Sequence, residues 1–239
     1  MAKIIFEEAR HIYWKEEDDG TRVKIPSVTR IIGVLEKPAL MYWAAEVVAR
    51  FLIGLIPDIK AGKLVLTPED AKDLFWKAKK EPERLKEEAG NVGTLTHEAV
   101  EHYLKTGGKP KGLSPEVQKT FNAFLSFSKQ LKLGKIIATE KILFSSSYEY
   151  AGRLDIFAWL GSKKYIIDIK TGKDFYKEQP LQLSAYSNAY EEMTGEKVDG
   201  IGIIRLSKED GLSYWKDFTA EREISFRKFL CLLDFISLK

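Results

Sequence analysis

The sequence predicts an α/β fold: a central mixed β-sheet flanked by helices, with an N-terminal hairpin and a helical elaboration before the sheet. Most of the chain before residue 135 has a helical hydrophobic period, and the period then changes to that of strands. A helix, two more strands and a closing helix follow, which is the succession typical of a mixed sheet covered by helices. The predicted strands are residues 135–145, 150–160, 164–170, 198–206 and 211–218.

The first ninety residues predict a hairpin followed by helices. Residues 11–29 contain two strand-like runs around the turn signal "DDG". Ser27 is a suitable cap for a short helix, and Pro38 opens a longer apolar one. Thr67 begins a capping-box-like sequence, which predicts a further helix ending near Lys80.

The helices next to the predicted sheet have recognisable ends. Residues 92–104 predict a helix that stops at the loop "KTGGKPKG", and Ser114 caps the helix after it. Beyond the third strand, a helix over 178–193 ends at Gly195, and a closing helix covers 220–237. Each sheet segment therefore has a helix next to it in the chain.

Bulk composition favours one globular domain. The 239 residues are 44% hydrophobic, which is enough for a packed core, and no repeat or linker interrupts them. We therefore expect a single domain over residues 1–239, with the hairpin and helical elaboration in 1–90 and the core in 91–239. A net charge of +3 is too small to identify a partner.

Cysteine content and hydropathy narrow the class further. Cys231 is the single cysteine, which excludes an intramolecular disulfide and a cysteine-ligated zinc or iron–sulfur site. Its apolar surroundings predict a buried thiol in a reducing compartment. The N-terminus becomes charged within a few residues, and Glu46 and Arg50 interrupt the most apolar stretch. We expect neither a signal peptide nor a membrane anchor.

Residues 150–173 carry charge where strands usually do not. Asp155, Asp168 and Lys170 lie inside two apolar strands, although acidic residues are disfavoured there. A turn at the "SK" dipeptide between them would pair Asp155 with Lys170 and Leu160 with Tyr165. Strand alternation then predicts that all three charged side chains share one face of the sheet.

Two interpretations of this charged patch stay open. The simpler one is a cross-strand ion pair between Asp155 and Lys170. It leaves Asp168 unpaired between two isoleucines, where an unneutralised carboxylate is costly. A hard divalent cation, which prefers oxygen ligands, accounts for both acids. Arg153, two residues before Asp155, is either a contact for a phosphate or a solvated side chain.

One helix offers an imidazole to the same patch. His97 and His102 invite comparison with zinc-protease helices, but those need histidines four residues apart. These two are five apart and so lie about 140° apart around the helix, which excludes that motif. His97 alone remains a candidate metal ligand, with an ordinary surface histidine as the alternative. The neighbouring Glu98 and Glu101 are expected to be solvated or to pair with lysines.

Four short motifs then match a known pattern. "GTLTHE", "AGRLD", "IDIKTGK" and "QLSAY" occur in this order between residues 90 and 190. Together they resemble the RecB-like branch of the PD-(D/E)XK nuclease superfamily, including phage-type exonucleases, whose pattern is G-x-x-x-H, G-x-x-D, D-x-K and Q-x-x-x-Y. The proline that names the superfamily is absent here, since Leu154 precedes Asp155. The resemblance implies a restriction-endonuclease-like core.

The resemblance also implies roles for individual residues. His97, Asp155, Asp168 and the main-chain carbonyl of Ile169 would be metal ligands, and Lys170 would be the catalytic lysine. The ion would be Mg²⁺ or Mn²⁺, with Mn²⁺ at least as effective because an imidazole is a softer ligand than Mg²⁺ prefers. A lone cysteine cannot hold the iron–sulfur cluster of some relatives. The helix of the last motif would bring Gln182 and Tyr186 close to the substrate. Glu140, on the strand before the one that carries Asp155, is expected to support the site without being a metal ligand.

The implied function is a metal-dependent deoxyribonuclease, an exonuclease of recombination, repair or phage DNA processing that leaves 5′-phosphate and 3′-hydroxyl ends. Its partners would be DNA and a recombination or single-strand-binding protein, without a membrane, in the cytoplasm of a prokaryote or a phage-infected host. Two alternatives stay open. One is a non-catalytic nucleic-acid-binding subunit of a recombination or repair complex that keeps the fold. The other is a structural domain with ordinary ion pairs.

Overall fold

The computed structural model describes residues 3–238 and divides into two compact units. The larger unit combines the N-terminal residues up to Leu35 with everything from Leu95 onward. The smaller unit is Glu36–Thr94. The N-terminal hairpin thus belongs with the central sheet. That the whole chain functions as one domain stays a prediction.

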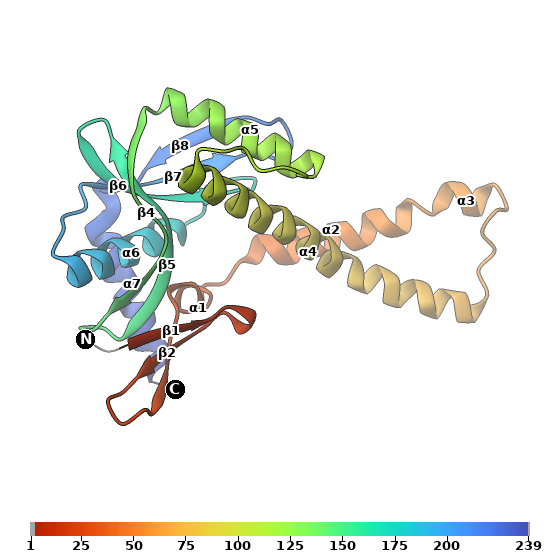
Figure 1. The fold of residues 1–239 in the computed structure, drawn as a ribbon. Coiled ribbons are helices and arrows are strands. Elements are labelled where there is room, and N and C mark those ends of the chain that lie inside the picture. The colour runs from red at the N-terminus through yellow and green to blue at the C-terminus, as the bar shows by residue number, and fades with distance from the viewer. Residues whose placement is uncertain (1–2, 239) are drawn as a thin grey trace. The chain divides into compact units, whose positions relative to one another are not determined.

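The larger unit is built on a five-stranded mixed sheet (Figure 1). Neighbouring strands are antiparallel except for one parallel pair, β6 with β7. A parallel pair needs a crossover connection, and helix α6 (Gln179–Thr194) supplies it. The predicted fold class, α/β with a mixed sheet flanked by helices, is confirmed and is consistent with a restriction-endonuclease-like core. The strands, in spatial order, are β4 (Leu133–Ser145), β5 (Tyr150–Leu160), β6 (Lys163–Lys170), β7 (Gly200–Leu206) and β8 (Ser213–Asp217).

Helices cover both faces of this sheet. On one face α6 packs against the strands, and α7 (Arg222–Ser237), which follows the short 3-10 helix η2 (Thr219–Glu221), packs against α6. On the other face lies α5 (Pro115–Gln130), where the Ser213 hydroxyl of β8 donates to the Ala123 carbonyl at 2.9 Å. The core on the α6 side includes Tyr150, Leu154, Ile166, Leu183, Ile203 and Phe229, all fully buried.

The N-terminal residues form a second, smaller sheet. Its strands are β1 (Lys3–Glu7), β2 (Ile12–Glu16) and β3 (Arg22–Ile25), with the 3-10 helix η1 (Glu8–Arg10) after β1. The predicted hairpin, β2 with β3, is confirmed, whereas β1 was not predicted. Main-chain contact between Pro26 and Ala151 joins this sheet to β5, through a 3.0 Å hydrogen bond. Helix α1 (Val28–Ile32) follows, and Ser27 caps it as predicted by accepting from the Arg30 N–H at 3.1 Å.

The smaller unit consists of helices. They are α2 (Pro38–Ile53), α3 (Ile56–Lys60) and the first part of α4 (Pro68–Thr106). The predicted capping box is confirmed: Thr67 N–H donates to the Asp70 carboxylate at 2.9 Å, and the Asp70 N–H donates back to the Thr67 hydroxyl at 3.2 Å.

The predicted end of that helix near Lys80 is wrong, because α4 continues through Pro82 to Thr106. A proline inside a helix removes one main-chain hydrogen bond but does not always end the helix. Here Arg84 pairs with Glu81 and Glu88 across the same turns, which supports the helical conformation after the proline.

The smaller unit exposes many apolar side chains. Tyr42 is 74% exposed and Val65 78%. By length and composition alone, Pro38–Lys60 is apolar enough to cross a membrane, and 6% of its most apolar window is buried. In the structure this stretch is two helices, with Gly54 and Leu55 between them.

Two surface features complete the description. The prediction of a buried Cys231 is wrong, because its side chain is exposed. Helix α7 directs Phe229 and Leu233 into the core, and Cys231 falls between them on the outer side.

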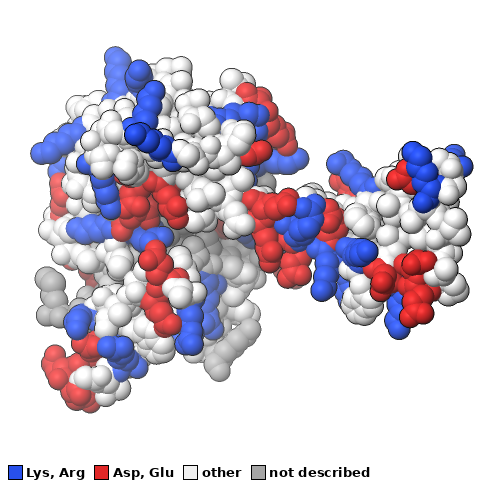
Figure 2. All heavy atoms as spheres, turned by 45° about the vertical axis from the view of Figure 1, so that its right-hand side comes forward, with Lys and Arg blue, Asp and Glu red and all other residues white. Residues whose placement is uncertain are grey.

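Basic and acidic side chains are interspersed over the face seen in Figure 2, as the small net charge would suggest.

Candidate active site

The hairpin of β5 and β6 has a tighter turn than predicted. Its two turn residues are Gly161 and Ser162, and Gly161 has the positive φ of 61° that such turns favour. Leu160 therefore pairs with Lys163, not with Tyr165, and Asp155 does not face Lys170. The predicted register was wrong by two residues, a shift that keeps side chains on their predicted faces.

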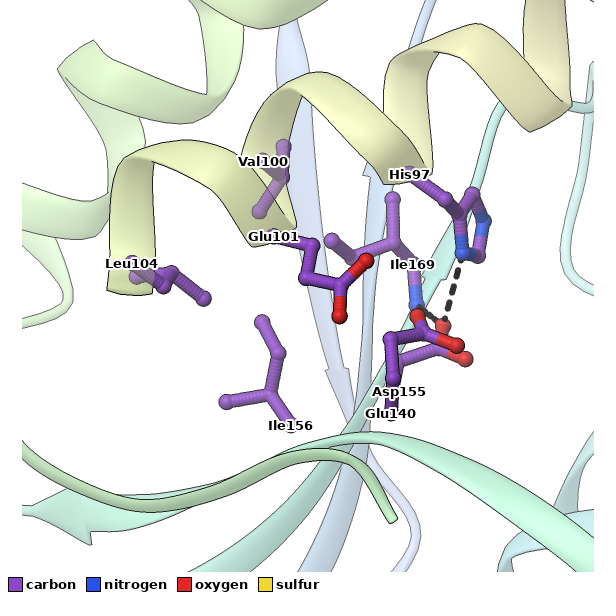
Figure 3. A pocket seen from close by; sticks show the side chains of 8 residues that line it. All are labelled: His97, Val100, Glu101, Leu104, Glu140, Asp155, Ile156 and Ile169. Atoms are coloured by element: carbon purple, nitrogen blue, oxygen red, sulfur yellow. Dashed lines mark hydrogen bonds and ion pairs between the residues drawn. The ribbon is translucent and has the colours of Figure 1, made fainter. Parts of the chain in front are cut away.

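Asp155 lies where β5 and β6 separate. The ladder between them ends at the Ile156–Ile167 pair, while β5 continues its pairing with β4. Beyond that point the Asp155 side chain takes over the role of a main-chain acceptor, since its Oδ2 accepts from the Ile169 N–H at 2.8 Å (Figure 3). An acidic residue in this strand is thus held by the sheet itself.

Three potential metal ligands converge at this point (Figure 3). His97 Nδ1 lies 3.3 Å from Asp155 Oδ2. Together with a Glu140 oxygen, one ligand atom from each residue lies within 4.8 Å of the other two. They line a small pocket whose remaining walls are Val100, Glu101, Leu104, Ile156 and Ile169.

Helix α4 brings His97 to the sheet. The preceding residue, Thr96, is buried and its hydroxyl is 2.7 Å from that of Thr120 on α5, which ties the two helices together. Glu98 points to solvent, and Glu101 pairs with Lys105 as expected while also lining the pocket. His102 is exposed, in agreement with the exclusion of a two-histidine zinc helix.

Glu140 enters the site from β4. The pairs Thr139–Ile156 and Lys141–Leu154 flank it, so it lies across from Asp155. Its φ of 48° is left-handed, a strained conformation for a non-glycine residue inside a strand. Burial raises the pKa of Glu140 to about 7, and the Asp155 charge adds to this, against the opposing effect of Arg153.

Arg153 is held beside Glu140. Its Nε lies 2.8 Å from Glu140 Oε2, and its Nη1 lies 3.6 Å from Glu8 Oε1. The guanidinium also stands 5.2 Å from the centre of the Phe6 ring. The structure thus places Arg153 in contact with an acid of the site and with the N-terminal sheet.

Asp168 and Lys170 form a pair of their own. Lys170 Nζ is 2.7 Å from Asp168 Oδ2 and 3.0 Å from Oδ1, and only the second contact has hydrogen-bond geometry. The predicted alternative, an Asp155–Lys170 pair that leaves Asp168 unpaired, is therefore wrong. By strand alternation both side chains share the face of Ile166, toward α6.

The electrostatics of this pair reflect its surroundings. Asp168 is only 2% exposed, and burial together with Asp155 raises its pKa despite the nearby Lys170. Burial disfavours the charge on Lys170, but the attraction of Asp168 and Asp155 outweighs it and raises the pKa of Lys170. The lysine therefore stays charged, with its side chain 28% exposed.

Helix α6 presents the last predicted pair. Gln182 Nε2 donates to the Tyr186 hydroxyl at 2.9 Å, and both side chains are buried. Burial, followed by the charges of Asp168 and Asp155, raises the pKa of Tyr186 well above its usual value. Gly152 makes room for this ring, since an added Cβ would lie 2.5 Å from Tyr186 Cε1.

The donors of the pocket fit a divalent cation. One imidazole nitrogen and two carboxylates suit Mn²⁺ and, less closely, Mg²⁺. Within residues 3–238 the converging set is His97, Glu140 and Asp155 and does not include Asp168. Sequence reasoning gave Glu140 only a supporting place. Its signal was the one that marked Asp155, an acid inside an apolar strand.

Comparisons with known proteins add distant neighbours. No family model and no curated protein matches the chain. Among solved structures, SSO0001 aligns with a TM-score of 0.31 and 14% identity, over 50% of this chain and 57% of that one. An alkaline exonuclease from Laribacter hongkongensis aligns with a TM-score of 0.30 and 14% identity, over 58% of this chain and 77% of that one. At this distance neither neighbour assigns the chain to a family.

Proposed function

We propose that the protein is a divalent-metal-dependent nuclease that hydrolyses phosphodiester bonds of DNA. The observation that carries this proposal is the convergence of His97, Glu140 and Asp155 within 4.8 Å. The raised pKa of Glu140 adds to it, because a buried acid beside a second acid favours a cation. Next to this cluster stands a buried carboxylate, Asp168, already joined to a lysine.

The residues divide into two roles. His97 Nδ1 and the carboxylates of Glu140 and Asp155 would hold the ion, and Asp155 is kept in place by the Ile169 N–H. When bound, Mg²⁺ or Mn²⁺ supplies Lewis-acid activation of a water and of a phosphoryl oxygen. Lys170, kept charged by Asp168, offsets negative charge that develops on the phosphate. Asp168 orients this ammonium group. From the motif resemblance we also propose that Asp168 and the main-chain carbonyl of Ile169 coordinate the metal ion.

The finer assignment rests on the four motifs. They support an exonuclease of DNA recombination, repair or phage DNA processing, acting in the cytoplasm with DNA and a recombination or single-strand-binding protein as partners. Arg153, Gln182 and Tyr186 would then lie beside the bound DNA, with Arg153 exchanging its contact to Glu140 for one to a phosphate. The non-catalytic alternative shares the fold but predicts binding without cleavage.

One experiment tests the proposal directly. The purified full chain is incubated with labelled linear, circular, single-stranded and double-stranded DNA in Mn²⁺, Mg²⁺ or EDTA. We expect cleavage with Mn²⁺ at least as fast as with Mg²⁺, none with EDTA, and no cleavage of circles if the enzyme needs an end. The variant Glu98→Gln, next to His97 but pointing to solvent, is the matched control and should keep full activity.

Two outcomes contradict the proposal. Cleavage that persists in EDTA excludes a metal mechanism. Failure to cleave any of the four substrates with either ion, while the protein still retards DNA in a gel without metal, favours the non-catalytic subunit. Wild-type rates in Asp168→Ala and Lys170→Ala would remove these two residues from the mechanism.

A further inference from the structure

A second cation lies beside Lys170 at the end of the parallel strands. Lys170 of β6 and Arg205 of β7 are paired in register. Residues paired across parallel strands point to the same face, so the two side chains are neighbours. The carboxyl ends of parallel strands are where open α/β sheets usually bind their ligands.

Arg205 is held in a defined orientation by aromatic rings. Its guanidinium carbon lies 4.0 Å from the centre of the Tyr214 ring, on the partner strand β8, and Arg205 and Tyr214 are paired in register. The centre of the Phe175 ring, in the loop after β6, lies 5.6 Å from the same guanidinium carbon. Stacking on rings fixes the plane of the guanidinium and leaves its edge available to an acceptor.

The hydrogen-bonding capacity of Arg205 is largely unused. Its Nη1 donates to the Gly172 carbonyl at a long 3.5 Å. Among residues 3–238, no partner hydrogen-bonds its buried Nε. A buried donor without a partner is costly, and a ligand acceptor would satisfy it. Arginine is the residue best suited to phosphate, because its planar fork binds two oxygens at once.

More positive charge surrounds this position. Lys216, exposed on β8, places its Nζ 5.6 Å from the Phe175 ring centre, so two cations lie close to this ring. Lys216 is two residues along β8 from Tyr214, the register partner of Arg205. Lys170, Arg205 and Lys216 thus give positive charge to β6, β7 and β8, which suits a sugar-phosphate backbone.

We propose that Arg205 binds a phosphate of the DNA strand adjacent to the phosphate that Lys170 faces. This inference rests on the proposed nuclease function and deepens it, since it names the group that holds the strand in register. Tyr214 acts as the platform for the guanidinium, and the Gly172 carbonyl directs it toward the end of β6.

The test measures DNA binding without catalysis. Fluorescence anisotropy of a labelled oligonucleotide in EDTA, repeated over a salt series, gives the affinity and its salt dependence. Arg205→Met keeps the aliphatic packing and removes the charge and the fork. We expect about tenfold weaker binding and a salt slope smaller by about 1, because one phosphate contact is lost. Arg227→Met, the same change at an exposed position of α7, is the control and should bind like wild type.

Arg205→Lys separates the fork from the charge. It should keep the salt slope and bind about threefold more weakly, since a lysine contacts phosphate as a point charge. If Arg205→Met does not fold, as judged by circular dichroism, this conservative variant carries the test, and wild-type affinity in it overturns the inference. A purely structural arginine would lower the melting temperature of Arg205→Met while leaving its affinity and salt slope unchanged.

The inference and the proposed function fail in different ways. A wild-type protein that cleaves DNA while Arg205→Met binds normally removes only the phosphate site. A wild-type protein that never cleaves, but whose DNA binding in EDTA depends on Arg205 as described, removes only the nuclease activity and keeps the phosphate site.

Discussion

Two glutamates at β4, Glu140 in the middle of the strand and Glu192 of α6 beside its last residue, illustrate the difference between a structural acid and a candidate functional one. Glu192 of α6 accepts hydrogen bonds from Ser145 Oγ and Ser146 Oγ, both at 2.6 Å, and from Ser147 N at 2.7 Å. Partial burial works against its charge, but these donors outweigh that effect and lower the pKa of Glu192. Glu140 forms an ion pair with Arg153, and its pKa is raised to about 7. Hydrogen bonds from the chain satisfy the first acid, whereas the second keeps a raised pKa even with Arg153 beside it.

Backbone conformation separates the same two regions. Glu149 and Glu140 both have positive φ, 52° and 48°. Glu149 lies in the β4–β5 connection near Glu192, where a left-handed residue is ordinary turn geometry. Glu140 adopts it inside a long strand, where its strain has to be offset by the surrounding structure. A strained backbone and a raised pKa thus occur together at Glu140, whereas Glu192 on α6 has a lowered pKa and the positive φ near it belongs to a turn residue.

The largest expected effect is on the cleavage rate, where an acid of the pocket and Glu192 should behave differently. Asp155→Asn preserves the shape and the acceptor for the Ile169 N–H but removes the charge that holds the ion. We expect the cleavage rate with Mn²⁺ to fall by about 10³-fold, in the range of losing a major electrostatic contribution. Glu192→Gln, with the same chemical change outside the pocket, should keep the wild-type rate. Gel-based cleavage assays at saturating DNA compare the two variants.

Equal activity losses in the two variants would show that Asp155 matters only through folding. A melting curve recorded without metal tests whether Asp155→Asn affects folding. Asp155→Asn should melt no lower than wild type, because it removes repulsion between Asp155 and Glu140.

The next effect is stabilisation by the ion itself. Mn²⁺ at a hundredfold excess over its dissociation constant should stabilise the wild-type protein by about 2.7 kcal/mol. A tenfold weaker site in Glu140→Gln would reduce that gain by about 1.4 kcal/mol. Glu192→Gln should show the full gain. Thermal melting with and without Mn²⁺ measures the gain in stability of the wild-type protein and of both variants. A gain in Glu140→Gln equal to that of the wild type would place the ion elsewhere.

The sequence identified most of the charged residues of the candidate site, but it gave no indication of the cluster around Glu192. Asp155, Asp168 and Lys170 stood out because acids are rare inside apolar strands, and the alternation argument put Asp168 and Lys170 on one face. The turn was misplaced, although "GS" after Leu160 is a better turn signal than "SK". Local pattern therefore predicted the elements and the charged positions more securely than the register.

Long-range pairing accounts for what the sequence did not show. Glu140 meets Asp155 only because β4 pairs with β5 through an irregular register, and no local pattern indicates its left-handed backbone. Helix α4 continues past Pro82, a local helix breaker, and the exposed ion pairs around Arg84 offset only part of the cost of the proline. Strand β1 was missed because it gains its stability from pairing with β2.

A smaller effect concerns folding stability at the other glutamate. Glu192→Gln removes charge-assisted hydrogen bonds from three consecutive serines, of which Ser145 is buried. Because Glu192 is largely exposed, we expect a loss of only about 1 kcal/mol in the free energy of unfolding. Urea unfolding at neutral pH measures it, with Glu98→Gln as an exposed control. A loss in Glu140→Gln of the same size would remove the distinction between the two acids.

The smallest effect is the pH dependence of that loss. The pKa of Glu192 is lower in the folded protein than its ordinary value of 4.5, so folding favours the ionised form. Its contribution to stability is therefore complete above about pH 4.5 and is lost as the pH falls through the lowered folded value. Other acids with lowered pKa, such as Asp70, titrate alike in both proteins, so the difference between wild type and Glu192→Gln isolates this one group. Urea unfolding from pH 3 to pH 7 should give curves that are separate at neutral pH and converge in acid. Curves that stay parallel would show that the serine hydrogen bonds do not depend on the carboxylate charge, and Glu192 would then no longer serve as the satisfied acid against which Glu140 is judged.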